Sequence, residues 1–563
     1  MDIKKIKIVA LIILVMLFWM CGRSQQKSFN DLTQAFFQWY FKSQPVLATE
    51  LGIFDYSHKF AKYNTDVQDE NLADLKRFII ELSQIDRAGL SKKSKIEYDI
   101  FTNALDEMVF DITQLREYEW NPLMIPTLIS TGISLIIDNS AISMDEKVGY
   151  LEGRLSKIPE IVNELQSKLN PSSEIHTKIA IQKVAGLIKY LIELPLSITS
   201  DNATLDRIDD LVKNSITSLN DYQQYLISIN KESDVTFRLG EDLYLQKFKY
   251  VISNETTPGE VYQSAQKTII DVQNQMFDIA LPFYLIENDE PVWVDRSDTL
   301  NVIDWTIGSL EQDLPIINLF SEKIDNSLIE LENFIKVHKI LRLDNNERFI
   351  LRETPDYKMQ SSLIDVELLN GNQNDVLYNI QIANAGKYSD VVLDLINMNQ
   401  VYPGYLVLER FKMDNSSQIS KIFSDEVFAS GWQYYCEGMM IEAGYKSDNS
   451  QYKLLQLSRL LKIAIDVILD QDIHMRDMSQ NQAVKLMVNE GFYSNISAEK
   501  NWIKAQLNYC KMSSGFIGTQ AIWNLRRDVE LQENNNFDLS EFHEELLSQG
   551  SIPIRYIRNI ISK

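Results

Sequence analysis

The chain has 563 residues, and its 45% hydrophobic content provides a sizeable core and is too high for extended disorder. Its 79 acidic residues outnumber its 55 basic residues and give a net charge of −24. A surface of that charge repels polyphosphates and anionic lipid head groups, so nucleic acid is excluded as an expected partner.

The N-terminal segment, residues 1–21, is typical of an export signal. A basic start with three lysines precedes an apolar run over residues 8–20, which is shorter than the ~20 residues of a full membrane span. Cys21 closes that run as in bacterial lipoprotein signals, in which the cysteine is lipidated and becomes the mature N-terminus. Such signals usually have a small residue where Met20 stands, so an uncleaved anchor is the alternative. The expected location is the bacterial cell envelope, periplasmic or surface-facing, with a membrane as partner.

Helical periodicity dominates after a short linker at residues 22–28. Apolar residues recur at three- and four-residue intervals in the ranges 72–85, 179–194 and 454–469. Thr257 and Glu260 form a capping-box pattern that predicts a helix start. Twenty glycines and thirteen prolines are too few for a β-sandwich or barrel, and only Cys436 and Cys510 follow Cys21, so no disulfide framework is expected.

Strand alternation is convincing in two short ranges, 348–353 and 376–382. The second range alternates apolar residues with Asn379 and Gln381, which predicts one buried and one polar face. We therefore predict a mainly α protein, with one large helical domain over residues 29–563 that carries a small antiparallel β-hairpin or sheet. Two lobes around a cleft are compatible with that length.

The segment that follows these strands, NQVYPGY at residues 399–405, has the spacing of a metal site without its ligands. A zinc hydrolase needs imidazole and carboxylate ligands, an open position for water and a glutamate as general base. The five histidines are too far apart in sequence to form one local site; they are His58, His176, His338, His474 and His543. His543 opens the segment HEELL, but Leu547 stands where a zincin would have its second histidine, so we predict a surface helix there.

Seven segments in a fixed order carry a family resemblance. They are QPVLATELGIFDY, EYEWNPLM, GRLSKIPEIV, RETPDY, NQVYPGY, SGWQYYCEGMMIEAGY and DQDIHMRDMS. In this order and spacing the chain resembles the bacterial family called domain of unknown function 885, helical secreted proteins and lipoproteins placed among gluzincin-type metallopeptidases. The resemblance implies a large gluzincin-like helical domain with the sheet next to the former active-site helix.

The resemblance also implies a zinc site whose ligands are replaced. The family motif H-E-x-x-P-G-H has its histidines at Asn399 and Tyr405 and its glutamate at Gln400, and the third ligand falls on Ser430. An amide binds zinc more weakly than imidazole, and glutamine cannot accept a proton at neutral pH. We therefore expect a vacated metal site, no metal cofactor and no intact catalytic residue.

Three functions remain open on this basis. The first is non-catalytic binding of a peptide or envelope component in the old cleft, or a role in assembly. The second is a hydrolase of altered chemistry, either with Ser430 as nucleophile and His474 as base or with a replacement metal site. The acidic candidates for such a site, besides His474, are Glu409, Glu426, Glu437 and Glu442. The third is a purely structural protein.

The candidates for lining the cleft are Tyr402, Trp432, Tyr435, Glu437 and His474. A set of five aromatic residues either fills the space left by an absent ion, with tyrosine hydroxyls paired to amides such as Asn399 and Gln400, or lines an open cleft. The set consists of Tyr402, Tyr405, Trp432, Tyr434 and Tyr435. The helix that carries Trp432 is expected to begin at Ser424 as N-cap and to stop at Gly444. Farther along, Gln520 and Trp523 stand where the resemblance implies a tyrosine and a glycine.

Overall fold

The structure is a computed structural model that describes residues 24–198, 201–230, 235–253, 256–287, 294–310, 320–343, 346–358, 364–369, 374–381, 389–415 and 417–561. The export segment with Cys21, and Ile382 of the second predicted strand, lie outside the described residues. The chain divides into two compact units, one of Met1–Ser172 with Ala180–Glu232 and one of Ser173–Ile179 with Ser233–Lys563.

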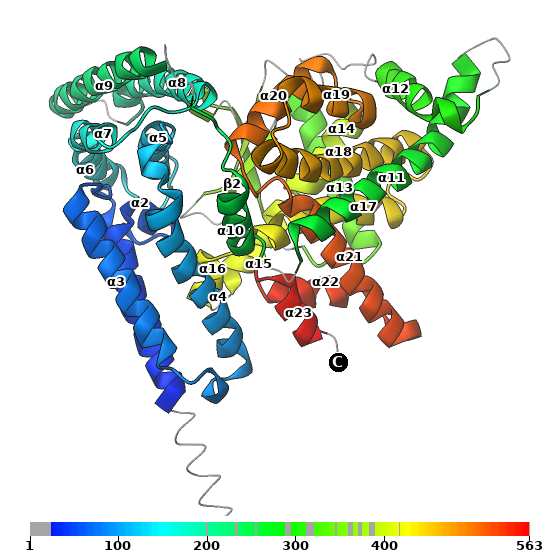
Figure 1. The fold of residues 1–563 in the computed structure, drawn as a ribbon, viewed down its shortest axis with the longest axis horizontal. Coiled ribbons are helices and arrows are strands. Elements are labelled where there is room, and N and C mark those ends of the chain that lie inside the picture. The colour runs from blue at the N-terminus through cyan, green and yellow to red at the C-terminus, as the bar shows by residue number, and fades with distance from the viewer. Residues whose placement is uncertain are drawn as a thin grey trace, which may run out of the picture. The chain divides into compact units, whose positions relative to one another are not determined.

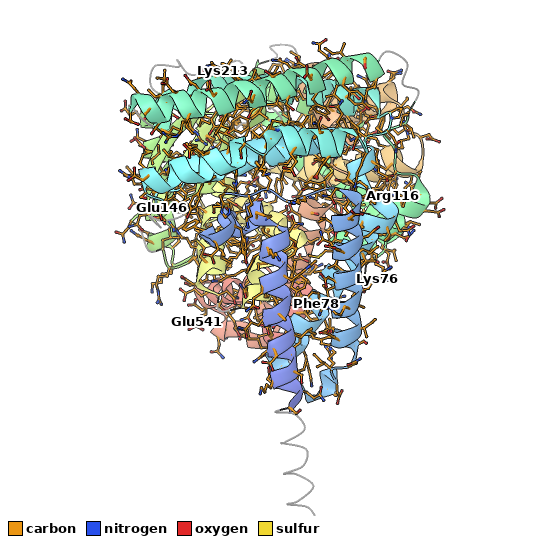
Figure 2. All side chains as sticks on the ribbon, turned by 90° about the vertical axis from the view of Figure 1, so that its left-hand side faces the viewer. Lys76, Phe78, Arg116, Glu146, Lys213 and Glu541 are labelled. Atoms are coloured by element: carbon orange, nitrogen blue, oxygen red, sulfur yellow. The ribbon has the colours of Figure 1, made fainter. Side chains whose placement is uncertain are left out.

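The first unit is helical throughout its described part (Figure 1). Its elements are a helix over residues 24–43, α2 (Pro45–Glu50), α3 (Thr65–Ser83), α4 (Lys92–Phe110), α5 (Met124–Ile137), α6 (Met144–Leu155), α7 (Ile158–Gln166), most of α8 (Glu174–Ile198) and α9 (Asn202–Asn230). Aromatic side chains join the first helices, because Phe36 packs against Phe78 of α3 and Phe101 of α4 with ring centroids 5.3 and 4.8 Å away. Figure 2 shows Phe78 directed toward the helix over residues 24–43 and Lys76 directed away, as the helical period requires.

A buried arginine holds several elements of the first unit together. Arg154 of α6 is fully buried and donates to the carbonyl oxygens of Lys59 and Gly132 and, at 2.6 Å, to the hydroxyl of Thr49. Burial lowers the pKa of Arg154 to about 9. The guanidinium is thus satisfied by neutral oxygens, which is how a buried charge without a carboxylate partner is tolerated.

The second unit contains all the positions predicted for the former metal site and its cleft. Its elements are α10 (Glu241–Val251), α11 (Pro258–Glu287), α12 (Thr299–Leu310), α13 (Phe320–Val337), β1 (Arg348–Glu353), β2 (Ile364–Leu368), β3 (Asp375–Ile380), α14 (Asp390–Gln400), α15 (Tyr405–Asp414), α16 (Gln418–Ile422), α17 (Glu426–Glu442), α18 (Ser450–Met475), α19 (Gln480–Gly491), α20 (Asn495–Leu507), α21 (Ser514–Glu533), α22 (Leu539–Ser548) and α23 (Ile554–Ile561). The long, largely buried helix α18 runs along α11 (Figure 1). The predicted capping box of α11 is confirmed, because Thr257 N donates to the Glu260 carboxylate at 2.8 Å and Glu260 N donates to Thr257 Oγ1 at 3.3 Å.

The small sheet is present, but its pairing differs from the prediction. β1 and β3, the two predicted strands, pair in parallel, and an additional strand, β2, pairs antiparallel on the other side of β3. The sheet is therefore mixed rather than antiparallel. As the central strand, β3 is buried along its whole length, and the predicted polar face is wrong because Asn379 is fully buried and bonded to Arg352 and Glu367.

The helix α17 begins one residue later than predicted. Asp425, not Ser424, is the N-cap, and its carboxylate accepts a hydrogen bond from Phe428 N at 2.7 Å. The predicted stop is confirmed at Gly444, whose φ of +101° suits a residue without a Cβ. α17 crosses α21 closely, because a Cβ on Gly518 would lie 1.9 Å from the carbonyl oxygen of Val427.

The mainly helical fold class is confirmed, as are the helices predicted over residues 72–85, 179–194 and 454–469. Within the described ranges, no single helix is long and apolar enough to cross a membrane. One pair, Lys92–Glu119 with Met124–Ile137, meets the length and composition test jointly and is bent by 104°.

Candidate functional site

The predicted motif lies at the turn between α14 and α15. Asn399 and Gln400 end α14, and Tyr405 begins α15, so the Pro403-Gly404 dipeptide interrupts the helix as expected. Position 404 requires a glycine, because a Cβ there would lie only 1.9 Å from the carbonyl oxygen of Asn399. The turn is therefore tight, and it fixes the end of α14 against the start of α15.

Asn399 is held in a hydrogen-bonded group that we name the Glu437 network: Asn399, Gln400, Glu437 and Arg459. The Asn399 amide donates to Glu437 Oε1 at 2.6 Å, and its Oδ1 accepts from Gln400 Nε2 at 2.8 Å. Arg459 of α18 makes two hydrogen bonds of 2.7 Å to the Glu437 carboxylate, whose side chain is 1% exposed. Burial lowers the pKa of Arg459, but the charge and hydrogen bonds of Glu437 outweigh burial and hold that pKa above its ordinary value.

Ser430 and His474 are each engaged elsewhere. Ser430 Oγ donates to Glu426 Oε1 at 2.9 Å, one turn earlier on α17. His474 Nε2 bonds to the carbonyl oxygen of Ala505 at 2.9 Å, and burial lowers the His474 pKa to about 4. Among the described residues no hydrogen bond joins Ser430 to His474, so the nucleophile–base pair considered from the sequence is not formed.

The aromatic cleft candidates are core residues. Tyr402, Trp432 and Tyr435 are 4%, 0% and 0% exposed, and the indole of Trp432 donates to the carbonyl oxygen of Pro403 at 3.0 Å. The core interpretation is therefore correct for these three residues, and the expectation that they line an open cleft is wrong. The predicted pairing of tyrosine hydroxyls to amides is wrong for two tyrosines, because Tyr402 donates to Glu347 at 3.0 Å and Tyr435 bonds to His543.

His543 belongs to this core and not to the surface, which corrects the prediction for HEELL. Its Nδ1 bonds to the carbonyl oxygen of Ile340 at 2.8 Å, so Nδ1 carries the proton and Nε2 accepts from the Tyr435 hydroxyl, also at 2.8 Å. Burial is the main cause that lowers the His543 pKa to about 4. The histidine is thus neutral and bonded through both nitrogens.

The residues at the positions implied for zinc do not fit that ion. Both functional groups of the Asn399 amide are committed to neighbours, and Ser430 bonds to Glu426. Ser430 also lies two turns before Glu437 on α17, about 10 Å along the helix axis, whereas Asn399 bonds to Glu437 itself. Within the part of the chain that the structure describes, no three His, Cys, Asp or Glu side chains form a metal-binding group, which includes the acidic candidates for a replacement site.

A pocket of about 410 Å³ adjoins the Glu437 network. Helices α11, α17, α18 and α21 form its walls, and Glu437 belongs both to the network and to the pocket. Its lining residues are Ser264, Lys267, Thr268, Asp271, Tyr434, Glu437, Gln456, Leu460, Thr519, Gln520, Trp523 and Asn524. Of the cleft candidates and aromatic residues named from the sequence, Glu437 and Tyr434 line this pocket, and the buried His474 does not.

Sequence reasoning missed Arg459 and Gln456. A signal existed for Arg459, since it interrupts the apolar segment 454–469 with a charge that a buried helix must pair. Gln520 and Trp523 were noted as departures from the family pattern, and both line the pocket.

The family model described as "Bacterial protein of unknown function (DUF885)" matches residues 45–561. The chain belongs to this family. Two solved structures share its fold: a candidate lipoprotein of unknown function from Shewanella oneidensis, with a TM-score of 0.80 and 23% identity over 95% of this chain and 100% of that one, and a candidate lipoprotein from Colwellia psychrerythraea, with a TM-score of 0.79 and 13% identity over 96% and 99%. A search of the curated proteins found no match.

Proposed function

We propose that this DUF885 protein is exported, anchored in the envelope by a lipid on Cys21, and binds a ligand without the zinc-dependent hydrolysis implied by its gluzincin-like resemblance. The ligand site in this proposal is the pocket walled by α11, α17, α18 and α21. Peptide-like or other envelope components are the expected class of partner.

The observation that carries the proposal is the Glu437 network. Asn399 stands where the resemblance places a zinc-binding histidine, and its amide spans Gln400 and Glu437 through hydrogen bonds of 2.8 and 2.6 Å. Zinc ligation through Oδ1 would break the bond from Gln400, and neither amide can serve as a general base. The buried polar groups are instead satisfied by one another, as in a stable structural core.

Two further observations support binding and an envelope location. The pocket volume of about 410 Å³ falls in the range of roughly 300–1,000 Å³ that is usual for small-ligand sites. The solved relatives from Shewanella and Colwellia are described as candidate lipoproteins, which agrees with the export pattern that ends at Cys21.

A fourfold reversion tests the proposal. The variant carries Asn399→His, Gln400→Glu, Tyr405→His and Ser430→Glu, and zinc content and peptide hydrolysis are measured for it and for the parent. Peptidase activity in the reverted chain together with an inert parent supports the loss of a zinc site. Zinc-dependent peptide hydrolysis by the parent contradicts the proposal and favours a hydrolase of altered chemistry.

A further inference from the structure

The pocket beside the Glu437 network is lined mainly by neutral hydrogen-bonding side chains. Hydroxyl or amide groups occur on Ser264, Thr268, Tyr434, Gln456, Thr519, Gln520 and Asn524. Leu460 is the one aliphatic side chain among the lining residues. Such a wall suits a polar ligand better than an acyl chain, because an acyl chain would leave these groups desolvated and unpaired.

The charges around the pocket compensate one another. The Glu437 carboxylate is neutralised by Arg459 through two hydrogen bonds of 2.7 Å. Lys267 and Asp271 contribute one charge of each sign from the same helix, α11. With Glu437 paired to Arg459, the lining carries one cation and one carboxylate and so no net charge, and the expected ligand is neutral.

Several donors in the pocket have no protein partner. The Tyr434 hydroxyl, the Gln456 Nε2 amide and the Trp523 indole N–H make no hydrogen bond to any residue in the described ranges, although Gln456 Oε1 accepts from Lys453 at 3.2 Å. They come from three helices, α17, α18 and α21. Gln456 is 6% exposed, so it can reach a partner only through the pocket.

Part of the remaining polar wall is held by hydrogen bonds between its own side chains. Ser264 Oγ donates to Gln520 Oε1 at 2.9 Å, and Gln520 Nε2 donates to Thr268 Oγ1 at 3.2 Å. This chain joins α11 to α21 across the pocket wall. The unpartnered donors thus face a preformed cavity, which lowers the entropy cost of binding.

We propose that the pocket binds one neutral sugar unit of an envelope glycan. This assignment rests on the proposed function and names its ligand class. A sugar ring presents hydroxyl, ring and acetamido oxygens to unpartnered donors, and its C–H face packs on aromatic rings such as those of Tyr434 and Trp523. An uncharged ligand also agrees with the compensated charges of the wall.

The test follows the tryptophans of the full chain, purified in detergent and labelled with 5-fluorotryptophan. Each tryptophan of the protein carries one fluorine label, and Trp523→Phe assigns the resonance of Trp523. The probes are chitotriose and maltotriose as neutral sugars, acetyl-trialanine amide as a neutral peptide, and inorganic phosphate. We expect saturable movement of the Trp523 resonance with at least one of the two sugars and no saturable movement with phosphate or the peptide.

Two variants on different helices test the named donors. Gln456→Leu and Trp523→Phe should each raise the dissociation constant for the sugar about fivefold to tenfold by removing one hydrogen bond. Isothermal titration calorimetry measures this constant, because Trp523→Phe lacks the reporter resonance. Trp305→Phe, in α12 and outside the pocket lining, is the matched control and should leave binding unchanged. Circular dichroism confirms that each variant is folded.

The proposal is overturned if neither sugar moves the Trp523 resonance at millimolar concentration, or if only the peptide or phosphate does. It is also overturned if the sugar binds equally well to both pocket variants. These failures are distinguishable from failure of the proposed function, which would appear as zinc uptake and peptide hydrolysis by the parent chain.

Discussion

Glu437 connects the replaced metal-site positions, helix α18 and the pocket. Its carboxylate receives one hydrogen bond from Asn399 and two from Arg459, and it also borders the pocket. A carboxylate that is 1% exposed must have its charge compensated, because desolvation of an unpaired charge costs several kcal/mol. Arg459 supplies that compensation.

Glu437→Gln should destabilise the fold because it leaves the Arg459 guanidinium without its counter-charge. We expect a loss of about 2 kcal/mol in the free energy of unfolding, since Arg459 keeps some contact with solvent. Urea unfolding measures the effect. Glu442→Gln is the control: Glu442 pairs with Arg526 but its side chain is 53% exposed, so its loss should cost less than about 1 kcal/mol. Equal losses would contradict the assigned role of Glu437.

Asp425 makes stability depend on pH. Burial is the largest cause that raises the Asp425 pKa to about 7, whereas the unfolded value is about 3.9. Because the folded pKa is the higher one, the folded state binds more protons than the unfolded state between these values. The stability contribution of Asp425 is therefore complete below about pH 4 and is lost as pH rises to about 7.

Asp425→Asn removes this titration and keeps an N-cap acceptor for α17. Relative to the parent, the variant should gain on the order of 2 kcal/mol between pH 4 and pH 7 and then level off. Urea unfolding across this pH range measures the difference. Ser389→Asn, at the N-cap of α14, exchanges one uncharged cap for another and should give a difference that does not change with pH. A flat difference for Asp425→Asn as well would contradict the burial argument.

At the scale of elements, the contact of α17 with α21 depends on two glycines. Gly431 and Gly518 face each other, and a Cβ on either would lie within 2.3 Å of backbone atoms of the opposite helix. The two helices carry Tyr434 and Trp523 to the same pocket. Their close contact therefore determines both the core and the pocket wall.

Gly518→Ala should force these helices apart and lower the free energy of unfolding by about 3 kcal/mol. The measurement is the urea unfolding midpoint, with the Trp523 resonance as a local readout. Gly308→Ala, in the same unit, is the control, because a Cβ on Gly308 meets no atom within 4 Å and should be neutral or slightly stabilising. Unchanged stability of Gly518→Ala would show that the helices can separate without cost.

Elements with local signals were predictable, and long-range partners were not. The capping box at Thr257 and the stop at Gly444 depend on residues a few positions apart, and both are confirmed. Strand direction depends on the path of the intervening chain, so the parallel pairing of β1 with β3 could not be read from alternation. β2 was missed because its five residues give too short a pattern.

The long-range contacts of the site also could not be predicted from the sequence. The family and the replaced motif positions followed from residue order, but burial of His543 depends on partners 108 and 203 residues away, Tyr435 and Ile340. The pocket combines side chains from four helices between residues 264 and 524. Periodicity assigns each side chain to a helix face and does not show which faces meet.

At the scale of the whole molecule, the proposal requires the chain to be held at a membrane through Cys21. Cys21→Ser should abolish incorporation of labelled palmitate and move the protein from the membrane fraction to the soluble fraction. Cys436→Ala, at a buried cysteine of α17, is the control and should remain membrane-bound. Membrane retention of Cys21→Ser without palmitate labelling would favour an uncleaved anchor.

The central claim is that the zinc site implied by the family resemblance has become a hydrogen-bonded network. The most direct test is the metal content of the purified parent chain by elemental mass spectrometry, after incubation with zinc, manganese, nickel and calcium and removal of excess ions. The account predicts no stoichiometric metal, because Asn399 and Ser430 are committed to Glu437 and Glu426. One tightly held ion per chain would contradict it and would indicate that another set of residues forms a metal site.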